Sequence, residues 1–137
     1  GVVNLIQSAK ASDIKRFILI SSISVTHANH PMNCFGKILD WKLEGENALR
    51  ESGLSYAIIR PGGLVESSDG HKSFVIDQGD KILGTISRTT LAEICVCAAD
   101  YPKNLHVTFE VIESEKDGIQ GCGEIFNSLK MDRIQTG

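Results

Sequence analysis

The chain has 137 residues, of which 42% are hydrophobic and 23% are charged, an ordinary composition for one soluble globular domain. Its formal net charge of −3 gives no general attraction for nucleic acid or anionic lipid, and its 14 lysines and arginines are scattered. The longest apolar run, Phe17 to Ile20, is far shorter than the roughly 20 residues of a membrane span. We therefore expect neither a nucleic acid partner nor a membrane-spanning segment.

The cysteines and histidines follow no metal-binding pattern. The cysteines form no CxxC pair and match no zinc-site spacing; they are Cys34, Cys95, Cys97 and Cys122. We interpret them as unpaired thiols in a reducing compartment, either the cytoplasm or the stroma or matrix of an organelle. His27 and His30 share a polar loop without a nearby carboxylate, so no metal site is expected. No secretory signal pattern is present, so we do not expect a secreted protein.

Apolar spacing predicts a helix, a strand and a second helix in the first third of the chain. Residues 2–11 carry apolar side chains at helical spacing, and residues 16–22 form a short apolar stretch typical of a strand covered on both faces. A loop over residues 23–36 precedes a helix over about 37–52. The residues expected on the inner face of that helix are Ile38, Trp41, Gly45, Ala48 and Leu49.

The middle of the chain is predicted to contain a buried strand and a hairpin. Residues 55–60 form the apolar strand, which Pro61-Gly62-Gly63 breaks. Short strands at 74–76 and 81–86 are expected to form a hairpin around Gly79-Asp80. Ser87 can then cap the next helix, although Thr90 with Glu93 offers a second capping register.

The remaining elements complete an alternating pattern. A helix is expected over about residues 88–99, a strand over 107–112, and a weakly structured tail with one short helix over 113–137. Alternation of helices and strands favours an α/β domain with a parallel sheet and right-handed crossovers. In such sheets ligands bind beyond the carboxyl ends of the strands, so the informative residues should follow Ile20, Arg60 and Ile86.

Three groups of residues at these strand ends or nearby could carry chemistry. Ser21 and Ser22 could donate hydrogen bonds to a substrate carbonyl, or could only satisfy loop backbone. Lys42, which can meet Glu46 one turn later, could bind ribose hydroxyls, or could be a solvated surface lysine. The glycines of Pro61-Gly62-Gly63 could let the backbone approach a flat ring, or could form a simple turn.

Four segments in this order together resemble one family. They are KRFILISS at 15–22, LRESGLSYAIIRPGG at 49–63, ISR with LAEI at 86–94, and TFEV at 108–111. This set resembles the atypical short-chain dehydrogenases/reductases, in particular the NAD(P)H-binding group with NmrA-like proteins, biliverdin reductase B-like proteins and the chloroplast Tic62 type. The resemblance covers about residues 2–131.

The resemblance implies a doubly wound, Rossmann-type sheet of which residues 1–137 form the C-terminal half. The half with the glycine-rich loop that grips the phosphates of NAD or NADP would be missing, and residues 118–123 do not replace it because they follow the last strand. We expect this chain alone to be inactive and to bind no NAD(P)H measurably. We also expect it to form homo-oligomers through the sheet edge that the missing half would cover.

The resemblance also assigns roles to individual residues. Ser22 and Lys42 match catalytic positions, and the cofactor-binding positions are Ser21, Ser22, Lys42, Pro61, Gly62 and Gly63. However, the tyrosine of the family's YxxxK motif is replaced by Ile38, which cannot donate a proton. Two functions therefore remain open: a reductase that transfers hydride from NAD(P)H to a small acceptor, and a non-catalytic NAD(P)H-binding sensor or scaffold module.

Overall fold

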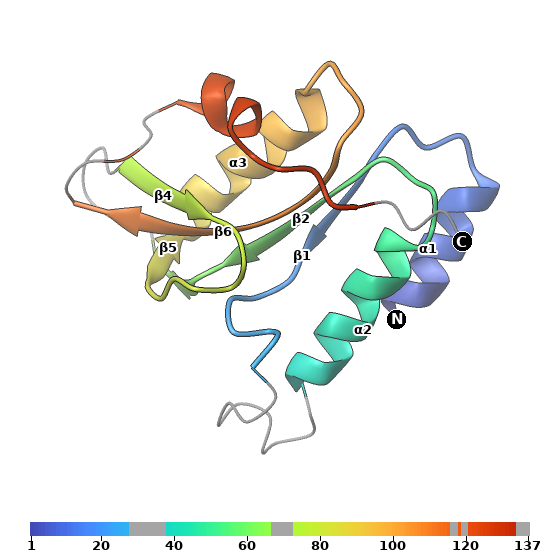
Figure 1. The fold of residues 1–137 in the computed structure, drawn as a ribbon, viewed down its shortest axis with the longest axis horizontal. Helices are drawn as coiled ribbons and strands as arrows, with labels where there is room; N and C mark the ends of the chain where they lie inside the picture. Colours follow the sequence, from blue (N-terminus) through green and yellow to red (C-terminus); the bar gives the residue numbers. More distant parts are fainter. Residues whose placement is uncertain (28–37, 67–72, 116–117, 119–120, 134–137) are drawn as a thin grey trace.

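The computed structural model describes residues 1–27, 38–66, 73–115, 118 and 121–133, without the side chains of residues 122–124. Its main sheet has four strands in the order β1-β2-β6-β4 (Figure 1). These strands are β1 (Phe17–Ile20), β2 (Tyr56–Pro61), β6 (His106–Ser114) and β4 (Ser73–Asp77). β1, β2 and β6 are parallel, whereas β4 runs antiparallel to β6. The predicted parallel core is therefore confirmed.

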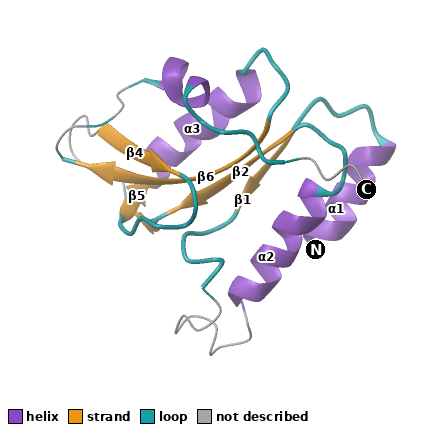
Figure 2. Ribbon diagram, viewed as in Figure 1, coloured by secondary structure: helices purple, strands orange, loops and turns teal. Residues whose placement is uncertain are grey.

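Helices cover both faces of this sheet, as the alternating sequence pattern predicts (Figure 2). The helices are α1 (Val2–Ala11), α2 (Ile38–Arg50), α3 (Arg88–Asp100) and a short 3₁₀ helix, η2 (Cys122–Asn127). Phe17 and Leu19 of β1 pack on the side of α1 and α2, whereas Ile18 between them packs on the side of α3. Side chains alternate between the faces of a strand, so a wholly apolar strand is required here.

The ends of α3 and of the chain are held by specific contacts. Ser87 is the N-cap of α3, and its hydroxyl accepts a hydrogen bond from the Thr90 amide over 3.2 Å, which selects the first of the two capping registers. In η2, Ile125 and Phe126 are buried in the core beneath α3. This part of the predicted tail thus contributes apolar surface to the main core.

The predicted hairpin around Gly79-Asp80 is wrong. β4 pairs with β6, which extends to Ser114, and the residues after it do not return as a partner strand. Instead β5 (Thr85–Ser87) pairs in parallel with β3 (Gly63–Val65) in a separate two-stranded sheet. The long free edge of β6 gives β4 a place where Phe74 is buried, which a small isolated hairpin could not provide.

The predicted inner face of α2 is also partly wrong, because Trp41 is 69% exposed and Ile38 is exposed. The buried stripe runs through Leu39, Gly45, Glu46 and Leu49. Gly45 lies against α1, where an added Cβ would be 3.2 Å from Val2 Cγ1. A small residue at this position lets the two helices approach.

The cysteines agree only in part with the expectation of unpaired thiols. Cys95 is a free thiol, and burial raises its pKa. Cys97 is disulfide-bonded, so the expectation is wrong for this residue. Cys34 lies outside the described residues, as does the side chain of Cys122.

Candidate functional site

A pocket of about 410 Å³ lies beyond the carboxyl ends of β1 and β2. Its size falls within the range of roughly 300–1,000 Å³ found for small-molecule sites. All six residues predicted to bind the cofactor line it: Ser21, Ser22, Lys42, Pro61, Gly62 and Gly63. The remaining lining residues are Ile20, Ile23, Ser24, Leu64 and Leu83. The structure thus collects the predicted residues from three separate segments, and their roles remain predictions.

The two predicted serines differ in their hydrogen bonding. The Ser22 hydroxyl donates to the carbonyl oxygen of Ile23 over 2.9 Å, so in this conformation it satisfies local backbone. Ser21 is only 5% exposed, and its Oγ has no hydrogen-bond partner among the described residues. A buried hydroxyl without a partner is unusual and calls for an explanation. A ligand in the adjoining pocket could provide that partner.

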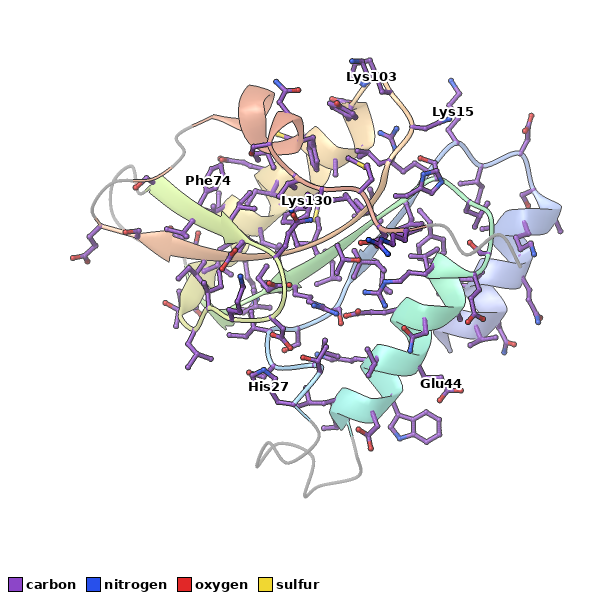
Figure 3. The ribbon with its side chains drawn as sticks, in the orientation of Figure 1. Lys15, His27, Glu44, Phe74, Lys103 and Lys130 are labelled. Carbon is purple, nitrogen blue, oxygen red and sulfur yellow. The ribbon has the colours of Figure 1, made fainter. Side chains whose placement is uncertain are left out.

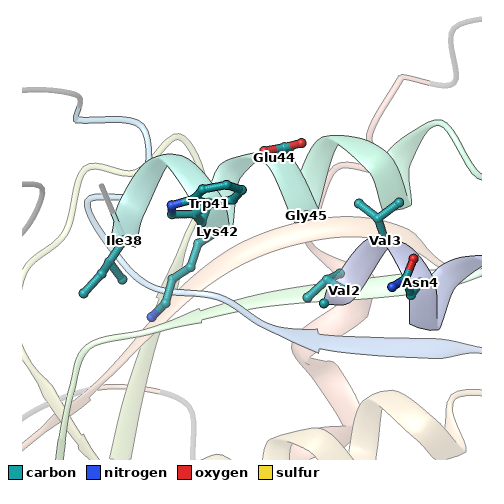
Figure 4. A pocket seen from close by; sticks show the side chains of 9 residues that line it. Val2, Val3, Asn4, Ile38, Trp41, Lys42, Glu44 and Gly45 are labelled. Carbon is teal, nitrogen blue, oxygen red and sulfur yellow. The ribbon is translucent and has the colours of Figure 1, made fainter. Parts of the chain in front are cut away.

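Lys42 reaches the pocket from the second turn of α2 and is half-buried. It also lines a second pocket between α1 and α2, together with Ile38 and Trp41, and Figure 4 shows the start of α2 extending beyond the start of α1 there. The expected ion pair between Lys42 and Glu46 is not formed, because Glu46 pairs with Arg50 and Arg60 instead. The Lys42 ammonium is therefore not neutralised by that carboxylate.

No tyrosine of this chain lines the site pocket. Ile38, at the position of the family's tyrosine, lines the neighbouring pocket instead. The chain has two tyrosines. The Tyr56 hydroxyl donates to Asp132 Oδ2 over 2.7 Å, and burial followed by this hydrogen bond raises its pKa. The Tyr101 ring packs against Phe126. Neither can act as the acid at this pocket.

The two glycines of the Pro61–Gly63 loop differ in how much space surrounds them. A Cβ on Gly62 would lie 2.4 Å from the carbonyl oxygen of Gly84 and 2.9 Å from Ile112 Cγ2, so close backbone packing alone requires glycine there. A Cβ on Gly63 would meet nothing nearer than 3.6 Å. The Gly63 amide donates to the Gly84 carbonyl over 3.0 Å, which fixes the loop beside β5. Of the two, only Gly63 could carry a Cβ without a clash.

Behind the pocket lies a buried ionic group that the sequence reading did not identify. Arg60 on β2 is 5% exposed, while Glu46 on α2 and Glu110 on β6 are fully buried. Arg60 donates to both oxygens of Glu46 over 2.7 and 3.0 Å, and to Glu110 Oε2 over 3.1 Å. Burial by itself lowers the pKa of Arg60, but these carboxylates raise it above its usual value. We call Glu46, Arg60 and Glu110 the buried triad.

The triad continues into a polar cluster at the start of β2. Arg50 donates to Glu46 Oε1 over 2.7 Å and to Thr108 Oγ1 over 3.1 Å. The Thr108 hydroxyl in turn donates to Asp132 Oδ2 over 2.7 Å. Consequently α2, β2, β6 and the segment after η2 are tied together by charge-assisted hydrogen bonds on one face of the sheet.

A sequence signal could have revealed the triad. The sheet is covered on both faces, so a charged residue within a strand is buried and needs a partner. Arg60 and Glu110 are such residues, and they stand opposite each other in the parallel register of β2 and β6. Within its own strand, however, Glu110 fits a simple alternation of apolar and polar residues, which by itself does not indicate burial.

His27, one of the two histidines of the predicted polar loop, is not among the residues that line the pocket. His27 is described, whereas His30 lies outside the described residues. Within the described ranges, no group of three or more His, Cys, Asp or Glu residues could hold a metal ion. A search of the same ranges finds no helix long and apolar enough to cross a membrane.

The pocket offers chemical groups of two kinds. It combines serine hydroxyls and the Lys42 ammonium with an apolar wall that includes Leu64 and Leu83. Ribose needs hydrogen-bonding groups, while a flat ring needs apolar surface and a close backbone. The buried Ser21 hydroxyl, which has no hydrogen-bond partner within the described part of the chain, adds a donor at the pocket. This donor set can hold ribose hydroxyls and a carboxamide.

Comparison with known proteins identifies the family of the chain. Residues 1–102 match the NAD(P)H-binding family. Sanguinarine reductase from Eschscholzia californica is 31% identical over 135 residues, which cover 94% of this chain and 49% of that protein. Protein TIC 62, chloroplastic, from Arabidopsis thaliana is 35% identical over 107 residues, which cover 73% of this chain and 17% of that protein.

Among solved structures, a protein of the NAD-dependent epimerase/dehydratase type from Bacillus halodurans superposes with a TM-score of 0.77 at 26% identity. The match covers 93% of this chain and 58% of that one. The chain thus spans about half or less of the length of these curated relatives. The match to residues 1–102 and the Rossmann-type fold together establish that the chain belongs to the NAD(P)H-binding family of atypical short-chain dehydrogenases/reductases.

Proposed function

We propose that this chain forms the nicotinamide-ribose side of the active site of an NAD(P)H-dependent reductase that acts on a small acceptor. The observation that carries the proposal is the single pocket beyond β1 and β2 that gathers Ser21, Ser22, Lys42 and the Pro61–Gly63 loop. We further propose that the chain is the C-terminal half of its dinucleotide-binding domain, which is supported by the roughly doubled length of sanguinarine reductase. The chloroplast relative TIC 62 supports an organellar rather than a secreted location.

Each residue has a defined task in this proposal. When bound, the dinucleotide supplies a hydride. Lys42 donates hydrogen bonds to ribose hydroxyls and orients the ring. The Ser22 hydroxyl turns from the Ile23 carbonyl to the substrate carbonyl oxygen, where it stabilises developing negative charge. Because Ile38 carries no exchangeable side-chain proton, the proton reaches the product from water.

A second candidate function rests on Ile38. With isoleucine at the tyrosine position and both tyrosines of this chain elsewhere, the pocket has no side-chain acid of the usual kind. A non-catalytic NAD(P)H sensor or scaffold module needs only the binding residues. Lys42 then has the same task as in the reductase, whereas Ser22 has no catalytic one.

Ser22→Ala separates the two functions. In the full-length protein that contains this chain, we expect NADPH oxidation with quinone or flavin acceptors, and we expect Ser22→Ala to reduce kcat by about 10²-fold or more, as for loss of one oxyanion donor. Ser8→Ala, on the exposed side of α1, is the control and should leave kcat unchanged. Wild-type protein that binds NADPH but passes no hydride to any acceptor would favour the sensor.

A further inference from the structure

Asp80 connects the serine segment of the pocket to the buried triad. Its Oδ1 accepts a hydrogen bond from the Ser24 amide over 2.6 Å, and its Oδ2 accepts from the amide and hydroxyl of Thr26 over 2.9 and 2.6 Å. The Asp80 amide donates to Glu110 Oε1 over 2.7 Å. Since Glu110 also binds Arg60, a continuous series of hydrogen bonds runs from the segment after β1 to the interior of the sheet.

The same series reaches the helix that carries Lys42. Arg60 binds Glu46, which lies one turn after Lys42 on α2, and Arg60 itself immediately precedes Pro61 on β2. The three segments that carry the predicted residues of the pocket are therefore fixed to one hydrogen-bonded unit: the serine segment through Asp80, α2 through Glu46, and the Pro61–Gly63 loop through Arg60.

Ser24 and Asp80, which contact each other, both have an unusual backbone conformation. Ser24 has φ 65° and Asp80 has φ 58°, and they are the described non-glycine residues with positive φ. Such a conformation is strained for a residue with a side chain and persists where the surroundings enforce it. Here the two residues are bonded directly to each other, and Ser24 lines the pocket. Constrained residues of this kind gather at functional sites.

Asp80 is an acceptor because it is ionised. Burial alone would raise its pKa, but the hydrogen bonds from Thr26 and Ser24 and the charge of Arg60 lower the pKa below its usual value. His27, labelled in Figure 3, places Nε2 3.1 Å from the Asp80 carbonyl oxygen and 3.8 Å from Oδ2. Glu110, on the other side, binds the Asp80 amide. An ionised carboxylate can accept all three bonds from the serine segment and donates none.

We propose that Asp80 is a positioning residue that holds the Ser21–Ser24 segment against the nicotinamide side of the pocket, in fixed relation to Lys42 and the Pro61–Gly63 loop. The inference rests on the proposed function and extends it to a residue that does not itself line the pocket. Misplacement of the serine hydroxyls by a fraction of an ångström would slow the reaction without removing any group that takes part in it.

Asp80→Asn is the sharpest test, because it preserves size but replaces one acceptor oxygen with an NH₂ donor. The single oxygen of the asparagine side chain can then accept from the Ser24 or the Thr26 backbone amide, but not from both. The matched control is Asp77→Asn, whose carboxylate accepts from the adjacent Gln78 amide. A second control is Ile94→Val in the core beneath α3, which loosens packing away from the pocket. All variants are made in the full-length protein and compared by amide hydrogen exchange, NADPH affinity and turnover.

We expect Asp80→Asn to speed exchange of the Ser24 and Thr26 amides by about 10-fold or more and to lower kcat by about 10- to 100-fold, with a smaller rise in KM for NADPH. Both controls should keep the wild-type kcat. This should hold for Ile94→Val even where its melting temperature falls as much as that of Asp80→Asn. Unchanged exchange at Ser24 and Thr26, or faster exchange with wild-type kcat, KM and NADPH affinity, would overturn the inference.

Failure of the proposed function gives a different pattern. Wild-type protein that oxidises no NADPH contradicts the reductase, and NADPH affinity then decides the role of Asp80. A roughly 10-fold loss of NADPH affinity in Asp80→Asn that is absent in Asp77→Asn supports the positioning role. Equal affinity of the two variants overturns it.

Discussion

Arg60→Met should lower the free energy of unfolding by about 3–5 kcal/mol, because it leaves two buried carboxylates without their cation. Methionine fills most of the volume of arginine, so the loss comes from the charges and not from a cavity. Glu46 would keep its hydrogen bond from Arg50 and Glu110 would keep the one from the Asp80 amide, but both carboxylates would lose the arginine between them. Urea denaturation followed by circular dichroism measures the change.

Two variants bracket this result. Arg60→Lys should fall between wild type and Arg60→Met, because an ammonium cannot make the paired contacts of a guanidinium with Glu46. Arg88→Met changes the same residue type at an exposed position and should stay within about 0.5 kcal/mol of wild type. A loss in Arg60→Met no larger than in Arg88→Met would contradict the importance of the triad.

The Arg60→Met variant should also change how stability depends on pH. Burial already raises the pKa of Glu110, and removal of Arg60 removes a charge that lowers it. A carboxyl whose pKa is higher in the folded than in the unfolded state binds more protons when folded, so its contribution to stability declines as pH rises through that interval. The destabilisation relative to wild type should therefore be smaller near pH 4.5 than at pH 7. An equal loss at both values would show that charge burial is not its cause.

Gly62→Ala should cost about 1–3 kcal/mol or more, because its Cβ would lie 2.4 Å from the backbone oxygen of Gly84. The clash involves backbone on both sides, so no side-chain rotation relieves it. Relief would require the Pro61–Gly63 loop to move away from β5, which would break the hydrogen bond from the Gly63 amide to the Gly84 carbonyl. Thermal unfolding of the purified variant measures the loss.

The neighbouring Gly63→Ala is the matched control. Its Cβ would meet ordinary contacts at 3.6 Å, so folding stability should be unchanged or rise slightly through the reduced freedom of the unfolded chain. If the two alanine variants were equally stable, the close approach of Gly62 to Gly84 would not be a real constraint on the fold.

The spacing of apolar residues predicted the elements whose conformation is encoded in their own sequence. The strands at β1, β2 and β6 are short apolar stretches, and α1 and α3 have apolar residues at helical spacing, so each could be recognised by itself. The antiparallel β4 and the β3–β5 pair could not, because a strand's partner depends on which edge of another strand is free. The exposure of Trp41 likewise depends on which other segments pack against the start of α2, which no property of α2 alone reveals.

The part of the candidate site formed by residues that directly follow a strand could be predicted from the sequence. Ser21, Ser22 and Pro61 to Gly63 follow β1 or lie at the end of β2, and such residues meet at one edge of a parallel sheet. Asp80 was missed because it lies in a turn that the sequence assigned to a hairpin. Its role depends on three hydrogen bonds to residues more than 50 positions away, which only the folded chain brings into contact.

The most direct test of this account is calorimetric titration of the full-length protein with NADPH, comparing wild type with Lys42→Ala. Lys42 is the cation that lines the pocket, and the account predicts that its loss weakens NADPH binding by about 10-fold or more, in line with the 1.5–3 kcal/mol of a hydrogen bond to a charged group. Lys10→Ala, at the exposed end of α1, should bind as wild type does. Equal affinity of wild type and Lys42→Ala would show that the nicotinamide-ribose end does not occupy this pocket.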